Sequence, residues 1–123
     1  PPCHLVICTP PFSISTPQLF SRVNVRRIVR RPDTAGMTAA LEAGDLAGVA
    51  RRMYNVFEDV LEPRRLAAIR EIEGVLIDCG ALGASMSGSG PSVFGVFHSE
   101  RQAQEAKARL EESWRDVFLC GPR

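Results

Sequence analysis

The sequence predicts an α+β sandwich, in which helices gather on one face of a mostly antiparallel sheet. Two observations lead to this class. Short apolar runs near both ends of the chain and at residues 93–97 are typical of strands, and the segments between them carry the periodicity of helices. The order is strand, several helices, a strand pair, helix and strand. At 123 residues, one domain over residues 1–123 is expected.

A strand and a short helix are expected first. The apolar residues 5–8 form a strand-like run that ends at Thr9-Pro10-Pro11, a stiff connection. Residues 15–17, Ser-Thr-Pro, then offer a hydroxyl cap and a proline in the first turn, which favours a helix start. The apolar face of this helix would consist of Leu19, Phe20 and Val23.

Three more helices are expected in the middle of the chain. Asp33 caps the first of them, and Gly44 closes it in the C′ position. The next, over residues 46–61, has the clearest helical spacing. Its buried face would be Leu46, Val49, Ala50, Met53, Phe57, Val60 and Leu61. Pro63 ends or kinks that helix, and a fourth helix follows as far as Gly80. Its apolar positions are Leu66, Ile69, Ile72 and Leu76.

A glycine-rich loop, a strand, a helix and a last strand are expected in the C-terminal third. The loop is placed at residues 83–92 and the strand at residues 93–97. Ser99 and Gln102 form a capping box that opens the helix. Its inward positions would be Ala103, Ala106 and Leu110. Residues 117–119 form the last strand.

The composition is that of an ordinary globular domain, 45% hydrophobic and 24% charged. A net charge of +1 gives no global attraction to nucleic acid or membranes. No apolar run approaches the ~20 residues that a membrane-spanning helix needs, and no signal-peptide pattern opens the chain. Four cysteines without C-x-x-C spacing indicate buried or incidental thiols in a reducing cytosol. They are Cys3, Cys8, Cys79 and Cys120.

The glycine-rich segment is the most informative part of the chain. Three glycines and four serines fall within residues 83–92, and successive N–H groups in such a turn can form a concave anion site. A Walker loop would need a lysine here, but the chain's one lysine is Lys107. A dinucleotide fingerprint would need glycine where Val93 stands, and a hydrolase elbow would need it at Ser87. A tight connection that requires small residues for packing is the alternative interpretation.

The other polar residues form no self-contained catalytic constellation. His4 and His98 are interpreted as surface histidines, and the acidic residues Glu58, Asp59 and Glu62 as a solvated edge. Arginines at residues 22–31 could grip phosphate if they lie one helical turn apart, although exposed arginine faces are common.

Residues 80–97, GALGASMSGSGPSVFGVF, resemble the third conserved motif of the GHMP kinases, which lies in the C-terminal domain of that superfamily. Residues 16–20 resemble the T-P-x-x-F segment of its diphosphocytidyl kinases. Residues 31–34, 44–46 and 55–58 resemble the same branch in the same order. The resemblance covers essentially the whole chain. It implies a ferredoxin-like sandwich, a four-stranded antiparallel sheet with helices on one face.

The resemblance also implies roles for individual residues. The ring of Phe20 would stack on the cytosine of a cytidine-containing substrate, a contact worth ~1–3 kcal/mol. Thr16 and Pro17 would line the same pocket. A core position on the short helix is the alternative for Phe20. The glycine motif would shape the active-site floor beside the phosphate-binding loop of the other domain, through Ser87, Gly88, Ser89 and Gly90.

The phosphate-binding loop and the catalytic aspartate and lysine of the GHMP kinases belong to their N-terminal domain, and nothing in this sequence resembles that loop. The chain starts Pro1-Pro2 and is expected to be the C-terminal domain alone, inactive, with no catalytic residue and no bound cofactor. The parent, a cytoplasmic enzyme, would phosphorylate the 2-hydroxyl of diphosphocytidyl-methylerythritol with ATP and Mg²⁺ in non-mevalonate isoprenoid biosynthesis. The face left by the missing domain would invite dimers.

Two alternatives remain at this point. The chain could come from another GHMP kinase such as homoserine kinase. It could also be a non-catalytic, ferredoxin-like ligand-binding module.

Overall fold

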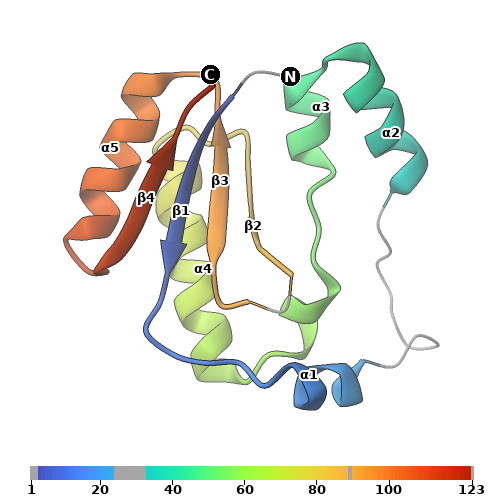
Figure 1. Cartoon of the computed structure of the whole chain (residues 1–123), viewed down its shortest axis with the longest axis vertical. Helices are drawn as coiled ribbons and strands as arrows, with labels where there is room; N and C mark the ends of the chain where they lie inside the picture. The colour runs from blue at the N-terminus through green and yellow to red at the C-terminus, as the bar shows by residue number, and fades with distance from the viewer. Residues whose placement is uncertain (1–2, 24–32, 89, 123) are drawn as a thin grey trace.

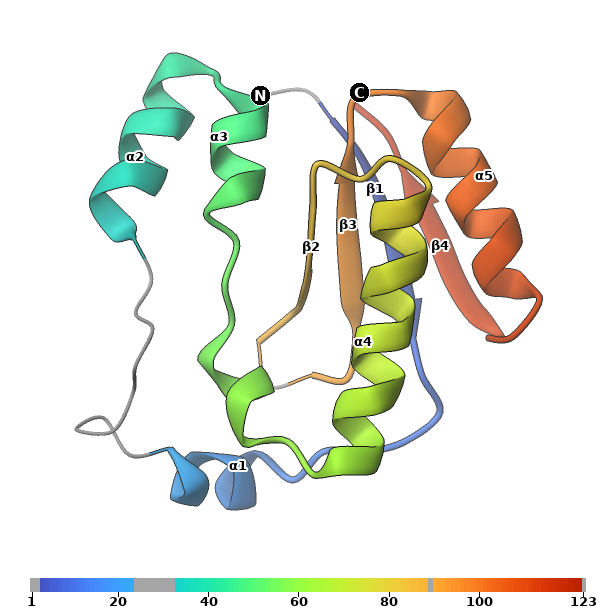
Figure 2. The same cartoon turned by 180° about the vertical axis from the view of Figure 1, so that it is seen from behind.

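The computed structural model describes residues 3–23, 33–88 and 90–122. Its centre is a four-stranded antiparallel sheet in the order β2-β3-β1-β4. The strands are β1 (His4–Thr9), β2 (Gly83–Met86), β3 (Val93–Phe97) and β4 (Asp116–Cys120). Helices α4 (Pro63–Asp78) and α5 (Glu100–Glu111) cover one face of this sheet (Figure 2). The predicted α+β, ferredoxin-like sandwich is therefore confirmed.

The register of the strands separates a buried face from an open one. Cys8 pairs with Val93 on one side and Val117 on the other, and all three side chains are buried under the helices. The core beneath α4 and α5 is completed by Val6, Met86, Phe97, Ile69, Ile72, Leu76, Ala103, Ala106 and Leu110. Burial, and secondarily the charge of Asp116, raises the pKa of the Cys8 thiol to about 12.

The opposite face of the sheet carries apolar side chains that no described helix covers. Ile7 pairs with Phe94 and Phe118, one residue along from the buried row. Ile7 and Phe94 are partly exposed, and Phe118 is 58% exposed. This face is turned toward the viewer in Figure 1.

In the described residues between β1 and α4, the chain forms four short helical elements. They are α1 (Thr16–Arg22), α2 (Thr34–Ala43), α3 (Leu46–Arg51) and the 3₁₀ helix η2 (Val56–Val60). Helix α2 packs on α3, and α3 packs against the edge strand β2 (Figure 1). A Cβ atom at Gly83 would lie 2.5 Å from the carbonyl oxygen of Ala50, so this approach of α3 to β2 requires glycine.

The predicted helix ends are confirmed where the signal is local. The Asp33 carboxylate accepts the Gly36 N–H at 3.0 Å, and Gly44 closes α2 in the left-handed region at φ 69°. The Ser99 hydroxyl likewise accepts the Gln102 N–H at 3.2 Å at the start of α5.

The single helix predicted for residues 46–61 is wrong. The chain leaves α3 after Arg51, runs extended through residues 53–55 and re-enters a helical conformation only as η2. Tyrosine, asparagine, valine and phenylalanine at residues 54–57 have low helix propensity, and Asn55 uses its side chain to cap η2. Pro63 accordingly begins α4, at a position where its missing N–H costs nothing.

The loop predicted for residues 83–92 is also partly wrong, because its first four residues are strand β2. Small residues suit this strand since α3 and β3 approach it closely from two sides.

We expect Gly83→Ala to lower the free energy of unfolding of the 123-residue chain by about 1–3 kcal/mol, because the added methyl group would overpack against Ala50. Gly74→Ala is the matched control. A Cβ atom there has no heavy atom within 4 Å, so it should raise stability by about 0.5–1 kcal/mol through helix propensity. Chemical denaturation of both variants measures the difference. Equal changes would contradict the close packing of α3 on β2.

Candidate functional site

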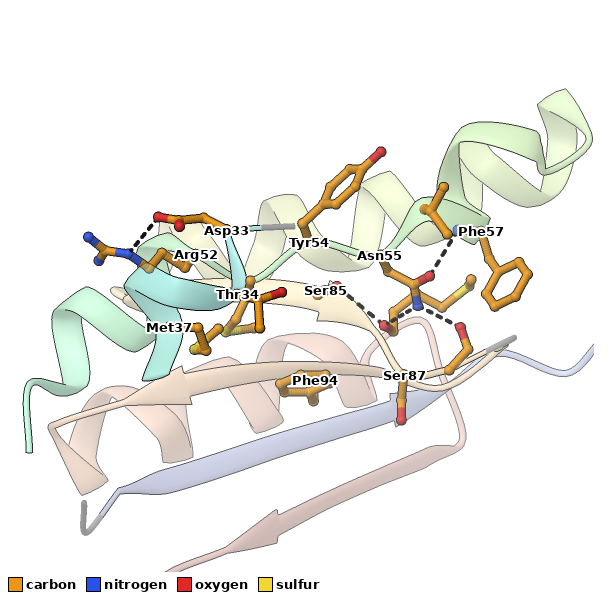
Figure 3. A pocket seen from close by; sticks show the side chains of 14 residues that line it. Asp33, Thr34, Met37, Arg52, Tyr54, Asn55, Phe57, Ser85, Ser87 and Phe94 are labelled. Carbon is orange, nitrogen blue, oxygen red and sulfur yellow. Dashed lines mark hydrogen bonds and ion pairs between the residues drawn. The ribbon is translucent and has the colours of Figure 1, made fainter. Parts of the chain in front are cut away.

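A hollow of about 490 Å³ lies beside the glycine-rich loop, between α2, residues 52–57 and strands β2 and β3 (Figure 3). Met37 and Phe94 point toward one another across it, whereas Tyr54 points away. The described residues that line it are Asp33, Thr34, Met37, Arg52, Met53, Tyr54, Asn55, Val56, Phe57, Ser85, Met86, Ser87, Gly88 and Phe94. An apolar floor with a polar rim suits a small amphipathic ligand.

The glycine-rich loop is fixed by the side chain of Asn55. Its amide nitrogen donates to two loop carbonyls, that of Met86 at 2.7 Å and that of Gly88 at 2.5 Å. Its amide oxygen accepts the Phe57 N–H at 2.9 Å and so caps η2. One side chain therefore joins the start of η2 to the end of β2 and the turn that follows.

Glu58, one turn further along η2, holds the same loop from inside the protein. The side chain of Glu58 is only 6% exposed. One of its oxygens accepts the Met86 N–H at 3.1 Å and the Ser85 hydroxyl at 3.2 Å. The other accepts Arg70 Nη1 at 3.0 Å, and the same Nη1 donates at 3.0 Å to the buried Glu73. The carboxylate is therefore a structural acceptor for the backbone of the loop.

An ion pair marks the outer rim of the pocket. Arg52 Nε lies 3.2 Å from Asp33 Oδ2, and Arg52 Nη1 donates to the Gly48 carbonyl at 2.8 Å. The pKa of Asp33 is lowered, first by the Gly36 N–H and then by its contact with Arg52. The rim thus presents a carboxylate and a guanidinium that are already paired with each other.

Comparison with known proteins shows which family the chain belongs to. Residues 37–116 match the family model described as "GHMP kinases C terminal". The chain belongs to this family. A 4-diphosphocytidyl-2-C-methyl-D-erythritol kinase from Syntrophomonas wolfei is 39% identical over 94% of the chain, and one from Clostridium novyi is 38% identical over 94%. The chain spans about 40% of the length of these relatives.

Solved structures of GHMP kinases share the fold. A homoserine kinase from Cytophaga hutchinsonii superposes with a TM-score of 0.75 and 23% identity over 95% of this chain and 41% of its own. A 4-(cytidine 5'-diphospho)-2C-methyl-D-erythritol kinase gives a TM-score of 0.73 and 24% identity over 97% of this chain and 42% of its own. The ferredoxin-like domain described above is thus the C-terminal GHMP domain.

In this GHMP domain, the predicted glycine-motif residues take different positions. Ser87 and Gly88 line the pocket, and Gly88 has a left-handed φ of 55°. Gly90 has a φ of 83°, and a Cβ atom there would lie 2.8 Å from Ile14 and 2.6 Å from Met86. Ser89 lies outside the described residues. The motif is therefore packed on its inner side and open toward the pocket at residues 87 and 88.

The predicted substrate residues Thr16, Pro17 and Phe20 lie on α1. The side chains of Thr16 and Phe20 fall outside what the structure describes, so the stacking role of Phe20 stays a prediction. Helix α1 packs against η2, where Arg22 donates to the Val60 carbonyl at 3.4 Å and pairs with Glu62 at 3.4 Å. The structure thus brings both α1 and the glycine-rich loop into contact with η2 and its capping residue.

The prediction of a solvated edge is correct for Asp59 and Glu62, which are exposed. It is wrong for Glu58, which is buried. Of the arginine stretch, residues 24–31 lie outside the described chain. Sequence reasoning missed the site roles of Asn55 and Glu58. An asparagine followed by β-branched and aromatic residues inside an apparent helix was the available signal.

We expect Asn55→Ala to lower the free energy of unfolding by about 2 kcal/mol, because it removes the cap of η2 and the amide donor that the carbonyls of Met86 and Gly88 share. Asn55→Asp keeps the capping oxygen, loses the donors and brings a negative charge to the two carbonyl oxygens, so its amide shifts should concentrate at residues 86–90. Gln104→Ala, on the exposed side of α5, is the control and should change stability by less than about 0.5 kcal/mol. An undisturbed loop in Asn55→Asp would contradict the assignment.

Proposed function

We propose that this chain is the C-terminal domain of a kinase that phosphorylates 4-diphosphocytidyl-2-C-methyl-D-erythritol with ATP in non-mevalonate isoprenoid biosynthesis. The observation that carries the proposal is the identity of 39% and 38% to kinases of that name over 94% of the chain. The solved homoserine, diphosphocytidyl and mevalonate kinase structures are 23%, 24% and 19% identical to the chain and support the fold alone. The similarity in sequence therefore favours the diphosphocytidyl substrate.

In this proposal the chain shapes one wall of the active site and leaves phosphoryl transfer to the rest of the parent enzyme. The wall consists of the glycine motif, Ser87, Gly88, Ser89 and Gly90, whose backbone would face the nucleotide phosphates. Within the described residues, no three His, Cys, Asp or Glu side chains cluster closely enough to hold a metal ion. Because the chain is proposed to be the C-terminal domain alone, we assign the ligands of Mg²⁺ and the proton-transferring groups to the rest of the parent enzyme.

The substrate's cytidine would contact α1, with Phe20 stacking on the base and Thr16 and Pro17 beside it. Two contacts of the described residues support a site shared with the glycine motif. Ile14, which precedes α1, lies against Gly90, and α1 packs on η2, whose Asn55 cap holds the loop. A cytidine on α1 and a phosphate near the loop would then both lie close to one short 3₁₀ helix.

The partner of the domain would be the remaining, N-terminal part of the parent. The open sheet face supports this, because Leu5, Ile7 and Phe94 line a hollow of about 450 Å³ and Phe118 is 58% exposed. In the 123-residue chain alone, that face should drive reversible dimerisation. Sedimentation analysis should show a dimer for the unaltered chain and a monomer for Phe118→Glu, and identical sedimentation of the two would contradict the assignment.

We place the parent enzyme in the cytoplasm. The four cysteines are free thiols in the structure, as suits a reducing compartment. The described part of the chain also has no helix long and apolar enough to cross a membrane. Fractionation of cells that express the parent gene tests this placement.

The substrate assignment predicts a defect that is specific to cytidine. In the full-length parent, Phe20→Ala should lower kcat/KM for the diphosphocytidyl substrate by roughly 5- to 150-fold, the equivalent of ~1–3 kcal/mol of base stacking. The KM for ATP should stay unchanged. Phe20→Leu is the matched variant, because it keeps apolar bulk and lacks an aromatic face.

Steady-state kinetics with the diphosphocytidyl substrate, homoserine and mevalonate as acceptors decide between the GHMP kinases. The proposal requires turnover of the first and a similar loss in both Phe20 variants. Turnover of homoserine instead would overturn the substrate, and full activity of Phe20→Leu would assign Phe20 to the core.

A further inference from the structure

Two buried carboxyl groups lie behind the glycine-rich loop and share one arginine. The side chains of Glu58 and Glu73 are 6% and 10% exposed, and Arg70 Nη1 lies 3.0 Å from an oxygen of each. One guanidinium supplies a single positive charge, so the cluster is neutral only when one of the two carboxyl groups carries a proton. Leaving a second negative charge in this buried place is unfavourable, since burial and like charge both oppose it.

The hydrogen bonds decide which group keeps the charge. Glu58 accepts from Arg70, from the Ser85 hydroxyl and from the Met86 N–H, which is the environment of a carboxylate. Glu73 accepts from Arg70 Nη1 at 3.0 Å, and the same nitrogen donates to Glu58, so the two carboxyl groups lie side by side on one donor. Burial, and then the charge of Glu58, raise the pKa of Glu73 from 4.5 to about 7.

We infer that Glu58 is the positioning residue of the glycine-rich loop and that a proton on Glu73, shared with Glu58, holds it in place. With the proton present, Glu58 is drawn toward its neighbour and its other oxygen stays on Met86 and Ser85. When the proton leaves, two negative carboxylates face each other behind β2, and Glu58 is pushed against the strand that it supports. The loop then shifts at the residues that line the pocket.

The surroundings of the pair add no second positive charge among the described residues. A small cavity of about 200 Å³ lies against it, and its described lining contains Asp59 and Tyr54 from the η2 side and Arg70 from α4. The Tyr54 hydroxyl donates to Asp59. From β2 the cavity is lined by Ala84 and Ser85, neither of which is charged. Arg70 is therefore the cation that both acids depend on.

The sign of the stability effect follows from the raised pKa. Between pH 4.5 and about 7 the folded chain holds a proton on Glu73 that the unfolded chain has released. Folding is therefore favoured at the acidic end of this window, and the contribution is lost as the pH rises through about 7. Because the loop lines the proposed active site, the kinetic consequence rests on the proposed function, whereas the loop shift does not.

The test is a pH titration of the 123-residue chain by NMR, following the amide signals of Met86 and Gly88 from about pH 5.5 to 8.5, a range centred on the pKa of the pair. In the unaltered chain both signals should move with a midpoint near 7. Glu73→Gln keeps the hydrogen bonds without the charge, so its signals should stay constant and it should unfold at higher denaturant than the unaltered chain at pH 8. Glu71→Gln, exposed on the same helix, is the matched control and should titrate like the unaltered chain.

A midpoint that persists in Glu73→Gln, or constant signals in the unaltered chain, would overturn the inference. In the full-length parent, Glu73→Gln should remove a step near pH 7 from the profile of kcat/KM. If the parent did not phosphorylate the cytidine substrate while the loop still titrated, the proposed function would fail and this inference would stand. If the parent phosphorylated the cytidine substrate while the loop signals stayed constant, this inference would fail and the proposed function would stand.

Discussion

The structure around the pocket depends on the attachment of the glycine-rich loop to η2. β2 is an edge strand, and the Met86 N–H on its outer side would meet water if nothing covered it. Glu58 accepts that N–H, and Asn55 donates to the carbonyls of Met86 and Gly88. The side chains of Asn55 and Glu58, one turn apart, therefore make the hydrogen bonds to the backbone that a neighbouring strand would otherwise make at this edge. Without them, the loop would keep the turn that its own backbone closes, from the Ser87 N–H to the Ser92 carbonyl at 2.7 Å, but it would lose its attachment to η2.

The rest of the domain determines where η2 can lie. The helices α4 and α5 bury one face of the sheet, and α4 begins at Pro63, directly after η2. α3 approaches β2 through the gap left by Gly83 and delivers the extended residues 53–55 along the same edge. Arg70 reaches back from α4 to Glu58. Between β1 and α4, the helix α3 is thus fixed to the sandwich by β2, and η2 is fixed by α4. These contacts determine where the glycine-rich loop lies.

Sequence signals succeeded where the physics is local. The caps at Asp33, Gly44 and Ser99 need only their neighbours in the chain, and all three are present. The prediction of one helix over residues 46–61 was wrong because a bent chain can show the same 3.6-residue apolar spacing. Here Phe57 and Leu61 come back to the same core after the bend. The position of β2 at residues 83–86 was not predicted, because pairing with β3, and not propensity, makes these residues a strand. The burial of Glu58 could not be predicted from local sequence, since its partners Arg70 and Ser85 lie 12 and 27 positions away.

Amide hydrogen exchange of Met86 in the unaltered chain tests the attachment of the loop most directly. A charge-assisted hydrogen bond of about 1.5–3 kcal/mol should slow exchange of this edge amide by at least roughly tenfold relative to an amide without a partner. Protection comparable to that of the β3 amides is the result that follows from the contact with Glu58. Exchange at the rate of a freely hydrated amide would contradict it and would remove the physical basis for a loop held by η2.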